Sequence, residues 1–348
     1  MNPTSIDDYI PGMFHLQWHI TERCNLRCTH CYQQSYNKPE LSLEQQVDIV
    51  DQFKEALDTL REKAGRRIAG HITVTGGEPF VRKDFFGLLD IFAQNKEYFS
   101  FSILTNGTYI DREMAKRLRE YHPTYVQISM EGSKETHESI RGEGTYDLAV
   151  NALKYLHREK IRTIASFTAH KQNYHEFPAV VKACKKIGVD RVWSDRLIPS
   201  GSGEEMSGYM LSPDETREFF ETMRREKKIA YWSPFCHTEV AMHRALQFLE
   251  GGRDYVCQAG KSLVTIDVNG DVYPCRRMPI KVGNVLEEKL IDIYNNNSLM
   301  KDLRDTSKCS SDCQSCEHFK RCQGGLRCLS YAVKGSPFEK DPGCWIQD

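Results

Sequence analysis

The amino-acid sequence predicts an α/β protein whose parallel sheet is covered by helices. Three observations support this: 348 residues are enough for a large core, short apolar runs alternate with helical periodicity, and the alternation repeats six times. Strands connected by single helices pair in parallel through right-handed crossovers. Because such sheets bind ligands at the carboxyl ends of their strands, a site is expected in the loops that follow the strands.

The predicted elements alternate along the chain. Strands are expected at residues 15–20, 71–75, 99–105, 125–130, 161–169 and 191–198. Helices are expected at residues 83–95, 111–121, 146–159 and 176–187, with two more beginning at Ser42 and Ser212. A long loop is expected at residues 131–145.

Both serines carry the pattern of a helix start. Ser42 and Gln45 match a capping box, and Ser212 and Glu215 match a second one with Pro213 at the first helical position. After Ser42, apolar residues recur at helical spacing, which predicts one buried helix face. That face consists of Val47, Val50, Phe53, Leu57 and Leu60.

Composition narrows the class of protein. Lys plus Arg is 47 and Asp plus Glu is 48, which leaves no sequence-wide basic footprint for nucleic acid. The N-terminus lacks an apolar signal core, and no apolar run reaches the roughly 18 residues of a membrane span. Thirteen cysteines without a secretory segment indicate metal binding in a reducing cytoplasm rather than disulfides.

The first motif is Cys24-x-x-x-Cys28-x-x-Cys31, directly after the first predicted strand. Zinc takes four ligands, usually as two pairs, whereas three thiolates can hold three irons of a 4Fe–4S cluster and leave the fourth open. The spacing resembles that of radical S-adenosylmethionine (SAM) enzymes. The resemblance implies a partial (β/α)6 barrel, SAM bound at the open iron, and cleavage to a 5′-deoxyadenosyl radical. A three-cysteine fragment of another metal site is the alternative.

The second motif, Gly76-Gly77-Glu78-Pro79, follows the second predicted strand. It resembles the element that contacts the methionine ammonium group of SAM in this family. Glycines let the backbone approach closely, and a carboxylate offsets the charge of an amine. The alternative is an ordinary turn before a helix.

Further cofactor contacts are implied at the ends of later strands. Asn106 follows the third strand, and Ser129 and Glu131 match a family position that contacts the ribose, with Glu131 in place of the usual Asp. Arg141 and Arg196 are predicted to hold the methionine carboxylate or a substrate carboxylate. For each arginine a simple surface position is the alternative.

Eight cysteines lie between residues 257 and 344. Asn269-Gly270 between two short apolar runs predicts a two-residue hairpin there. The cysteine pattern resembles the SPASM extension of radical SAM enzymes, which carries two auxiliary 4Fe–4S clusters. Cys328 departs from the pattern, because Leu326 occupies the expected place.

The resemblance implies a ligand set for each auxiliary cluster. One set is Cys313, Cys316, Cys322 and Cys344. The other is Cys257, Cys275 and Cys328, with either Cys309 or an open iron completing it. Two structural zinc sites are the alternative.

Two cysteines remain outside these sets. Cys184 is expected to be a buried apolar residue within a helix. Cys236 is expected in the core, with a hydrogen-atom donor or metal ligand as the alternative.

The expected organisation is an N-terminal tail (1–12), the radical SAM barrel (13–230), a bridging region (231–256) and the SPASM domain (257–348). The resemblance implies a cytoplasmic enzyme that oxidatively modifies a peptide or small protein, supplied with electrons by flavodoxin or ferredoxin. Alternatives are an epimerase or dehydrogenase of a small molecule such as a sugar, and a non-enzymatic iron–sulfur or zinc protein. The sequence motifs do not identify the substrate, because function resides in the site rather than in the fold.

Overall fold

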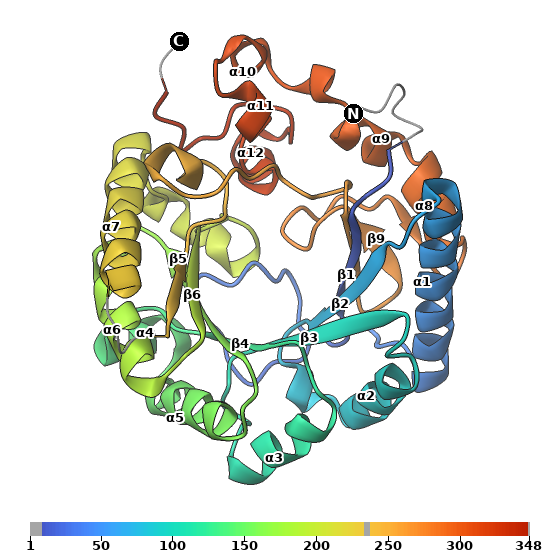
Figure 1. Cartoon of the computed structure of the whole chain (residues 1–348), viewed down its shortest axis with the longest axis horizontal. Helices are drawn as coiled ribbons and strands as arrows, with labels where there is room; N and C mark the ends of the chain where they lie inside the picture. Colours follow the sequence, from blue (N-terminus) through green and yellow to red (C-terminus); the bar gives the residue numbers. More distant parts are fainter. Residues whose placement is uncertain (1–8, 233–236, 347–348) are drawn as a thin grey trace. The chain divides into compact units, whose positions relative to one another are not determined.

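The computed structural model describes residues 9–232 and 237–346, and Figure 1 follows them along the chain. The chain divides into two compact units, each built from separate stretches of sequence. The first unit comprises Met1–Asn25, Ser35–Ile103 and Gln258–Cys309, and the second comprises Leu26–Gln34, Leu104–Cys257 and Ser310–Asp348. The domain boundaries that the sequence suggests stay predictions.

The first unit contains a sheet in the order β10-β9-β8-β1-β2-β3. Strands β8, β1, β2 and β3 run parallel, and β9 pairs antiparallel with both β8 and β10. The bounds are β1 Met13–His19, β2 Ala69–Thr75, β3 Phe99–Thr105, β8 Leu263–Ile266, β9 Asp271–Tyr273 and β10 Gly283–Asn284. The predicted hairpin is present, with β8 and β9 as its strands, but its turn is longer than the predicted two residues. The Asp267 amide donates to the Asp271 carbonyl at 2.8 Å, so residues 268–270 form the turn, and Gly270 has a φ of +86°, which glycine adopts without strain.

Helices of the first unit lie beside these strands (Figure 1). They are α1 Leu43–Ala64, η2 Pro79–Val81, α2 Phe85–Gln94, α8 Leu290–Asn296, α9 Ser298–Arg304 and η6 Thr306–Lys308. Their core is aromatic: Phe53 of α1 stacks on Phe14 of β1 at 5.6 Å between ring centroids, and Phe92 of α2 meets Phe99 edge to face at 5.5 Å. Such pairs add stability beyond their buried area.

Helix α1 begins as predicted, because the Ser42 side chain accepts from the Gln45 amide and the Gln45 side chain accepts from the Ser42 amide. The predicted buried face is wrong at one position. Val47 is 38% exposed, while Gln46 is buried. The Gln46 amide lies against the guanidinium of Arg82, so a polar partner rather than apolar periodicity sets this turn of the helix.

The second unit contains the parallel strands β4-β5-β6-β7 in that order. Their bounds are β4 Val126–Ser129, β5 Thr163–Ala169, β6 Arg191–Arg196 and β7 Glu239–Ala241. The helices of this unit are α3 Arg112–Glu120, α4 Lys134–Arg141, α5 Thr145–Arg158, η3 Tyr174–Glu176, α6 Phe177–Ile187, η4 Gly201–Tyr209, α7 Pro213–Trp232, η5 Gln247–Glu250, α10 Ser311–Ser315, α11 Phe319–Cys322 and α12 Arg327–Lys334. The predicted capping box of Ser212 and Glu215 is confirmed at the start of α7.

Two features of the second unit differ from the sequence prediction. The stretch 131–145, expected as a loop, contains helix α4, which Ser133 caps by accepting from the Thr136 amide. The expected bridging region contributes β7, which pairs with β6. Both elements are short, so neither produces a clear periodic signal in the sequence.

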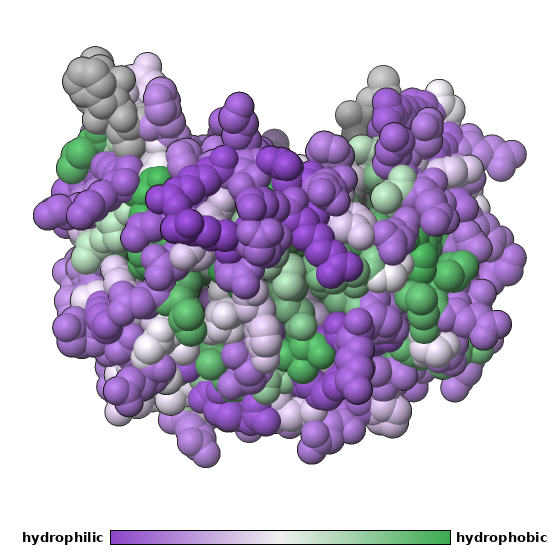
Figure 2. All heavy atoms as spheres, turned by 90° about the horizontal axis from the view of Figure 1, so that it is seen from below, coloured by the Kyte–Doolittle hydropathy of each residue, from purple (hydrophilic) through white to green (hydrophobic). Residues whose placement is uncertain are grey.

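Hydrophilic residues cover most of the face in Figure 2, with hydrophobic residues in small groups between them. Among the described residues, no helix combines the length and the apolar character needed to cross a membrane.

Candidate active site

The three cysteines of the first motif follow β1 in an irregular loop. Cys24 belongs to the first unit, and Cys28 and Cys31 belong to the second. Cys28 is 9% exposed, and its carbonyl oxygen accepts from the Cys31 amide at 3.2 Å. Thiols closely spaced in a loop are a suitable donor set for an iron–sulfur cluster.

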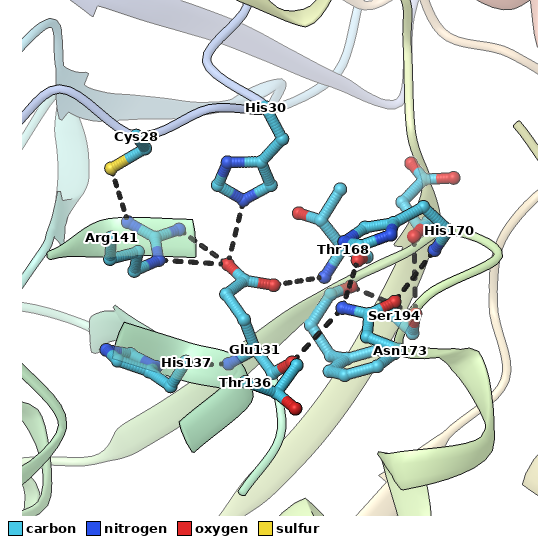
Figure 3. Close-up of polar contacts among 12 residues, drawn as sticks. Cys28, His30, Glu131, Thr136, His137, Arg141, Thr168, His170, Asn173 and Ser194 are labelled. Atoms are coloured by element: carbon cyan, nitrogen blue, oxygen red, sulfur yellow. Dashed lines mark hydrogen bonds and ion pairs between the residues drawn. The ribbon is translucent and has the colours of Figure 1, made fainter. Parts of the chain in front are cut away.

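A buried ion pair lies beside Cys28 (Figure 3). Arg141, the last residue of α4, donates from Nη1 to the Cys28 sulfur at 3.6 Å. Its Nη2 and Nε both donate to Oε1 of Glu131, at 2.6 and 3.1 Å. The same oxygen contacts Nε2 of His30, which follows Cys28 in the loop, at 3.1 Å. Glu131 therefore anchors both the cysteine loop and the arginine that reaches its sulfur.

Three further residues contact Glu131, and in Figure 3 Thr168 and Asn173 lie on the side of Glu131 that faces away from Arg141. Its Oε2 accepts from the Thr168 amide at 2.9 Å, its amide donates to Nδ1 of His137, and its carbonyl accepts from the Asn173 side chain. Burial alone opposes ionisation of Glu131, but Arg141 and His30 outweigh it and hold the pKa of this carboxyl well below its usual range. A charged, fully hydrogen-bonded carboxylate at this depth is a rigid anchor.

Charge and burial act in opposite directions on the Cys28 thiol. Burial raises the pKa of Cys28, while the Arg141 guanidinium acts to lower it. Because thiolate rather than thiol binds iron, the guanidinium favours the ligating form.

The predicted SAM loop is held tightly within the first unit. The Gly77 amide donates to the Thr21 carbonyl at 2.8 Å, and the Glu78 amide donates to the Arg23 carbonyl at 2.9 Å. A Cβ atom on Gly76 would lie 2.2 Å from the Thr21 oxygen, and Gly76 has a φ of +140°. The two glycines are therefore required by backbone approach, and the loop is fixed against the segment that enters the cysteine motif.

The Glu78 side chain is fully buried, and its Oε1 accepts from the Phe80 amide at 3.2 Å. It caps the short helix η2, in which Pro79 is the first residue. This geometry is compatible with an ordinary turn before a helix and also with a loop that contacts SAM. The contact with SAM stays a prediction.

Arg82 was not singled out by the sequence. It is 5% exposed and donates to the carbonyl oxygens of Ile20 and Leu41, at 2.6 and 2.5 Å, and it pairs with Asp84. These bonds connect the end of β1, the start of α1 and the SAM loop. Its position three residues after the Gly-Gly-Glu-Pro loop is the one local signal that the sequence offers.

Asn106 and Ser129 lie at the carboxyl ends of β3 and β4, as predicted. Asn106 Oδ1 accepts from both the amide and the hydroxyl of Thr108, and both predicted residues are partly exposed. Ser129 is in register with Ser166 of β5, which is in register with Trp193 of β6. These three partly exposed residues mark one face of the half-sheet, and the contacts of Asn106 and Ser129 with SAM stay predictions.

Arg244 extends that face at the loop after β7. Its guanidinium carbon lies 4.2 Å from the centre of the Trp193 ring and 5.6 Å from that of Tyr255. Its Nε lies 3.9 Å from a carboxylate oxygen of Asp195. Nothing local in the sequence predicts this cluster, because Trp193 and Arg244 are 51 residues apart in the chain.

A second set of thiols surrounds a pocket within the second unit. Other lining residues include Leu246, Phe248 and Asp341. The cysteines that line it are Cys313, Cys316, Cys322 and Cys344. Four thiols around one pocket fit the donor set of a 4Fe–4S cluster, and they are the four residues that the resemblance assigns to one. Among the described residues, no three metal-ligating side chains converge on a single metal-ion position.

Burial makes two thiols of this pocket, Cys322 and Cys344, unfavourable as free thiolates, because it raises the pKa of each. Burial, and next the charge of Asp341, raise the pKa of Cys322 to about 12. Iron binding must therefore displace protons here, which couples occupancy to pH.

The other cysteines divide between the units. Cys257 and Cys328 belong to the second unit, Cys275 and Cys309 to the first, and all four are buried. Their assignment to a second auxiliary cluster stays a prediction. Cys184 is fully buried, and burial raises its pKa to about 12, as expected of an apolar core residue. Cys236 lies outside the described residues.

Arg196 does not lie on the surface, which was the alternative for this residue. It is 3% exposed and makes two hydrogen bonds to Asp341, at 2.7 and 2.8 Å. A role in holding a cofactor or substrate carboxylate stays a prediction, and it requires Arg196 to exchange this partner. No sequence motif includes Asp341, which stands three residues before Cys344.

Comparisons with known proteins agree with both motifs. The model of the radical SAM superfamily matches residues 18–184, and the model of the SPASM iron–sulfur cluster-binding domain matches residues 257–317. The chain is 28% identical to Fe-coproporphyrin III synthase of Methanosarcina barkeri, over 94% of this chain and 87% of that protein. It is 29% identical to the mycofactocin maturase MftC of Mycobacterium tuberculosis, over 94% and 82%.

Solved structures share the fold. The structure of anSMEcpe with bound AdoMet and a peptide has a TM-score of 0.75 at 20% identity, covering 95% of this chain and 93% of that one. Streptococcus suis SuiB bound to S-adenosylmethionine has a TM-score of 0.72 at 20% identity, covering 97% and 78%.

The chain therefore carries a radical SAM domain and a SPASM iron–sulfur cluster-binding domain. It is an enzyme, so the alternative of a non-enzymatic iron–sulfur or zinc protein is wrong. The predicted fold class is confirmed: parallel strands of a partial barrel with a cysteine-rich C-terminal domain. Its cofactors are SAM and iron–sulfur clusters.

Proposed function

We propose that this enzyme uses SAM-derived radical chemistry to oxidise a peptide or protein side chain, and that it holds three 4Fe–4S clusters. The observation that carries the proposal is the four-cysteine pocket beside the loop that follows β7. Leu246 of that loop and Phe248 of the helix η5 that follows it line the pocket, while Arg244 of the same loop packs on Trp193. An electron acceptor would thus lie one loop away from the partly exposed face of β6.

The chemistry supplied when cluster and SAM are bound is one-electron cleavage to a 5′-deoxyadenosyl radical, which takes a hydrogen atom from the substrate. The protein's part is to fix the groups around it. Arg141 supports the Cys28 sulfur, and Glu131 fixes both Arg141 and His30. The Gly76–Gly77 backbone offers close approach for the methionine end of SAM.

The auxiliary pocket decides the fate of the substrate radical in this proposal. If the radical passes one electron to an auxiliary cluster and one proton to solvent, the substrate has lost two hydrogen atoms overall. A new bond or a double bond then remains in the product. The auxiliary cluster would return to its oxidised state by passing this electron to an oxidised electron carrier. The electron for SAM cleavage would come from an external donor, for which flavodoxin or ferredoxin is the proposed partner.

The peptide class is supported by relatives of two kinds. MftC is a maturase, and SuiB has been solved in complex with a precursor peptide. A second candidate, a tetrapyrrole-type small molecule, is favoured by the Fe-coproporphyrin III synthase and AdoMet-dependent heme synthase relatives. Sequence identity to the two groups is nearly equal, so substrate trials must include both.

The deciding experiment is anaerobic turnover of the reconstituted enzyme with SAM and a reductant. One arm contains peptides encoded beside its gene, and the other contains iron coproporphyrin. We expect a peptide product that has lost two hydrogen atoms, seen by mass spectrometry, together with 5′-deoxyadenosine. Product in the porphyrin arm alone would replace the peptide proposal with the second candidate.

The role of SAM contacts is tested separately by Glu78→Ala. Loss of a buried charged partner should weaken SAM binding by roughly 1–3 kcal/mol without removing a cluster. Gln45→Ala, at the exposed start of α1, is the control. Unchanged SAM affinity would leave Gly-Gly-Glu-Pro as a turn only.

A Cys236→Ala variant distinguishes oxidation of the substrate radical from the return of a hydrogen atom to it. In the oxidative proposal Cys236→Ala retains product, because no thiol hydrogen is needed. If the variant makes 5′-deoxyadenosine but no product, and solvent deuterium enters the wild-type product, the enzyme is instead an epimerase-like hydrogen-transfer catalyst.

A further inference from the structure

Arg196 and Asp341 form a buried ion pair between the last residue of β6 and the C-terminal segment. Each is 3% exposed. Nη1 donates to Oδ1 at 2.7 Å and Nη2 donates to Oδ2 at 2.8 Å. Burying two charges costs free energy that is recovered only with good geometry and additional hydrogen bonds. The two bonds between the partners have good geometry and Asp341 accepts further hydrogen bonds, so the position of this carboxylate is firmly determined.

Asp341 also holds two backbone segments in place. Its Oδ2 accepts from the Leu326 amide at 2.8 Å, and its Oδ1 accepts from the Gly343 amide at 2.9 Å. Its carbonyl oxygen accepts from the Cys344 amide at 2.9 Å. The segments fixed in this way are those that carry Cys322 and Cys344, two thiols of the pocket.

The surrounding backbone leaves no space for the pair to shift. A Cβ atom on Gly343 would lie 2.1 Å from Arg196 Nη1. A Cβ atom on Gly325 would lie 2.4 Å from Cβ of Asp341, and Gly325 has a φ of +80°. Two glycines are therefore needed where the chain closes around the pair.

The charge of Asp341 faces the thiols. Asp341 is one of the residues that line the four-cysteine pocket, whereas Arg196 is not. The ring of Phe220 in α7 lies 5.9 Å from the Arg196 guanidinium and 6.0 Å from the ring of Trp345, so apolar groups exclude water on that side. In such surroundings the charges of the pair are weakly screened.

We propose that Arg196 and Asp341 are a positioning pair for the auxiliary cluster. Asp341 holds the segments that carry its cysteines, and Arg196 joins Asp341 to β6 and offsets its negative charge. The proposal rests on the proposed function only in requiring that these four cysteines hold a cluster. It gives Arg196 a role outside SAM binding.

The two halves of the pair should act on the cluster with opposite sign. Asp341→Asn leaves the positive charge of Arg196 near the pocket, which favours the reduced cluster. Arg196→Gln leaves the negative charge of Asp341, which disfavours it. Charge and hydrogen bonding around the sulfurs are among the factors that set iron–sulfur potentials.

The test is the midpoint potential of the auxiliary cluster in the reconstituted full-length protein without substrate, followed by electron paramagnetic resonance. We expect a more positive potential in Asp341→Asn, a more negative one in Arg196→Gln, and a value near wild type in the double variant. Arg191→Gln is the matched control, since it lies in the same strand and pairs with the partly exposed Glu239.

Iron content and SAM binding complete the test. We expect less iron in both single variants and unchanged SAM affinity in the protein that retains the first cluster. Wild-type iron and potential in both variants would overturn the proposal, as would loss of SAM affinity in Arg196→Gln but not in Asp341→Asn. If Arg196→Gln does not fold by circular dichroism, Arg196→Lys keeps the charge and loses the paired hydrogen bonds. It should then keep the potential and lose iron.

A separate variant identifies failure of the proposed function. Cys344→Ala should lower iron content if the pocket holds a cluster. Unchanged iron in Cys344→Ala would reject the cluster assignment itself, whatever the Arg196 and Asp341 variants do.

Discussion

The second unit contains two buried pairs of an arginine and a carboxylate near cysteines, and they are oriented in opposite senses. In the first, Arg141 contacts the Cys28 sulfur, and Glu131 lies behind it. In the second, Asp341 lines the cysteine pocket, and Arg196 lies behind it. One thiol set therefore has a cation beside it and the other an anion.

The difference suggests a division of tasks. A cation beside a thiolate stabilises negative charge, which helps a cluster accept the electron that it passes to SAM. The carboxylate of Asp341 beside the four-cysteine pocket disfavours additional negative charge on a cluster there. Arg196, which is paired with Asp341, reduces this effect. The following predictions test this comparison, from the largest expected effect to the smallest.

The largest effect should come from removing the first thiol set. Replacing Cys24, Cys28 and Cys31 by Ala should abolish SAM cleavage and remove about four of about twelve irons. Iron analysis and 5′-deoxyadenosine assays measure both. Cys184→Ala is the control, because this fully buried cysteine is predicted to be an apolar core residue rather than a cluster ligand. Loss of all iron in the triple variant would show that the first cysteine motif and the C-terminal cysteines do not bind iron independently.

Breaking the first ion pair should be costly. Glu131→Ala leaves the Arg141 charge buried without its carboxylate, which is expected to lower the free energy of unfolding by roughly 3–5 kcal/mol. Urea unfolding of the iron-free protein gives this value. Asp147→Ala, which removes an exposed partner of Lys134, should have no measurable effect. A Glu131 variant as stable as the Asp147 variant would contradict the anchoring role.

The SAM loop gives an intermediate effect. A Cβ atom on Gly77 would lie 2.3 Å from the Arg23 carbonyl oxygen, so Gly77→Ala must displace the loop. Overpacking of this kind costs about 1–3 kcal/mol, and we expect SAM affinity to fall by a similar amount. Gly12→Ala, with no heavy atom within 4 Å of its Cβ, is the matched control. Equal SAM affinity in the two variants would show that loop position does not limit binding.

The sequence predicted the sheet and most helices because their signals are local. The Ser42 and Ser212 capping boxes and the Asn269-Gly270 turn each depend on residues a few positions apart, and all three are present. Helix α4 was missed because its eight residues form a short, polar segment. Its polar sequence resembles a loop, although the Ser133 cap was a readable signal.

The sequence predicted the motifs of the candidate site, but not the residues with which its arginines interact. Cysteine and glycine positions are recognisable by spacing alone. The partners of Arg141 and Arg196 are 10 and 145 residues away, and nothing local indicates the second. The same limit applies to Trp193 and Arg244, which packing brings together. Long-range pairs of charged or aromatic residues are fixed by topology, so a single sequence cannot identify them.

The buried histidine His71 contrasts with the two ion pairs, because burial favours its neutral form whereas the ion pairs are buried as charged groups. His71 of β2 contacts the hydroxyl oxygens of Ser100 and Ser102 through its two ring nitrogens, at 2.8 and 2.9 Å. Burial lowers its pKa from 6.5 to about 4. Between these two pH values the unfolded chain binds more protons than the folded chain, so stability falls as the pH falls from about 6.5 to 4.

The contribution of His71 is the smallest of the four effects, because other groups titrate in the same window. Its full shift corresponds to about 3 kcal/mol at most. We expect His71→Gln to flatten the decline in the urea midpoint of the iron-free protein between about pH 6.5 and 4. His175→Gln, at an exposed histidine, should keep the wild-type slope. An unchanged slope in His71→Gln would mean that other buried groups account for the acid sensitivity. In that case only the two ion pairs, and not the neutral His71, would have a measurable effect of burial on stability.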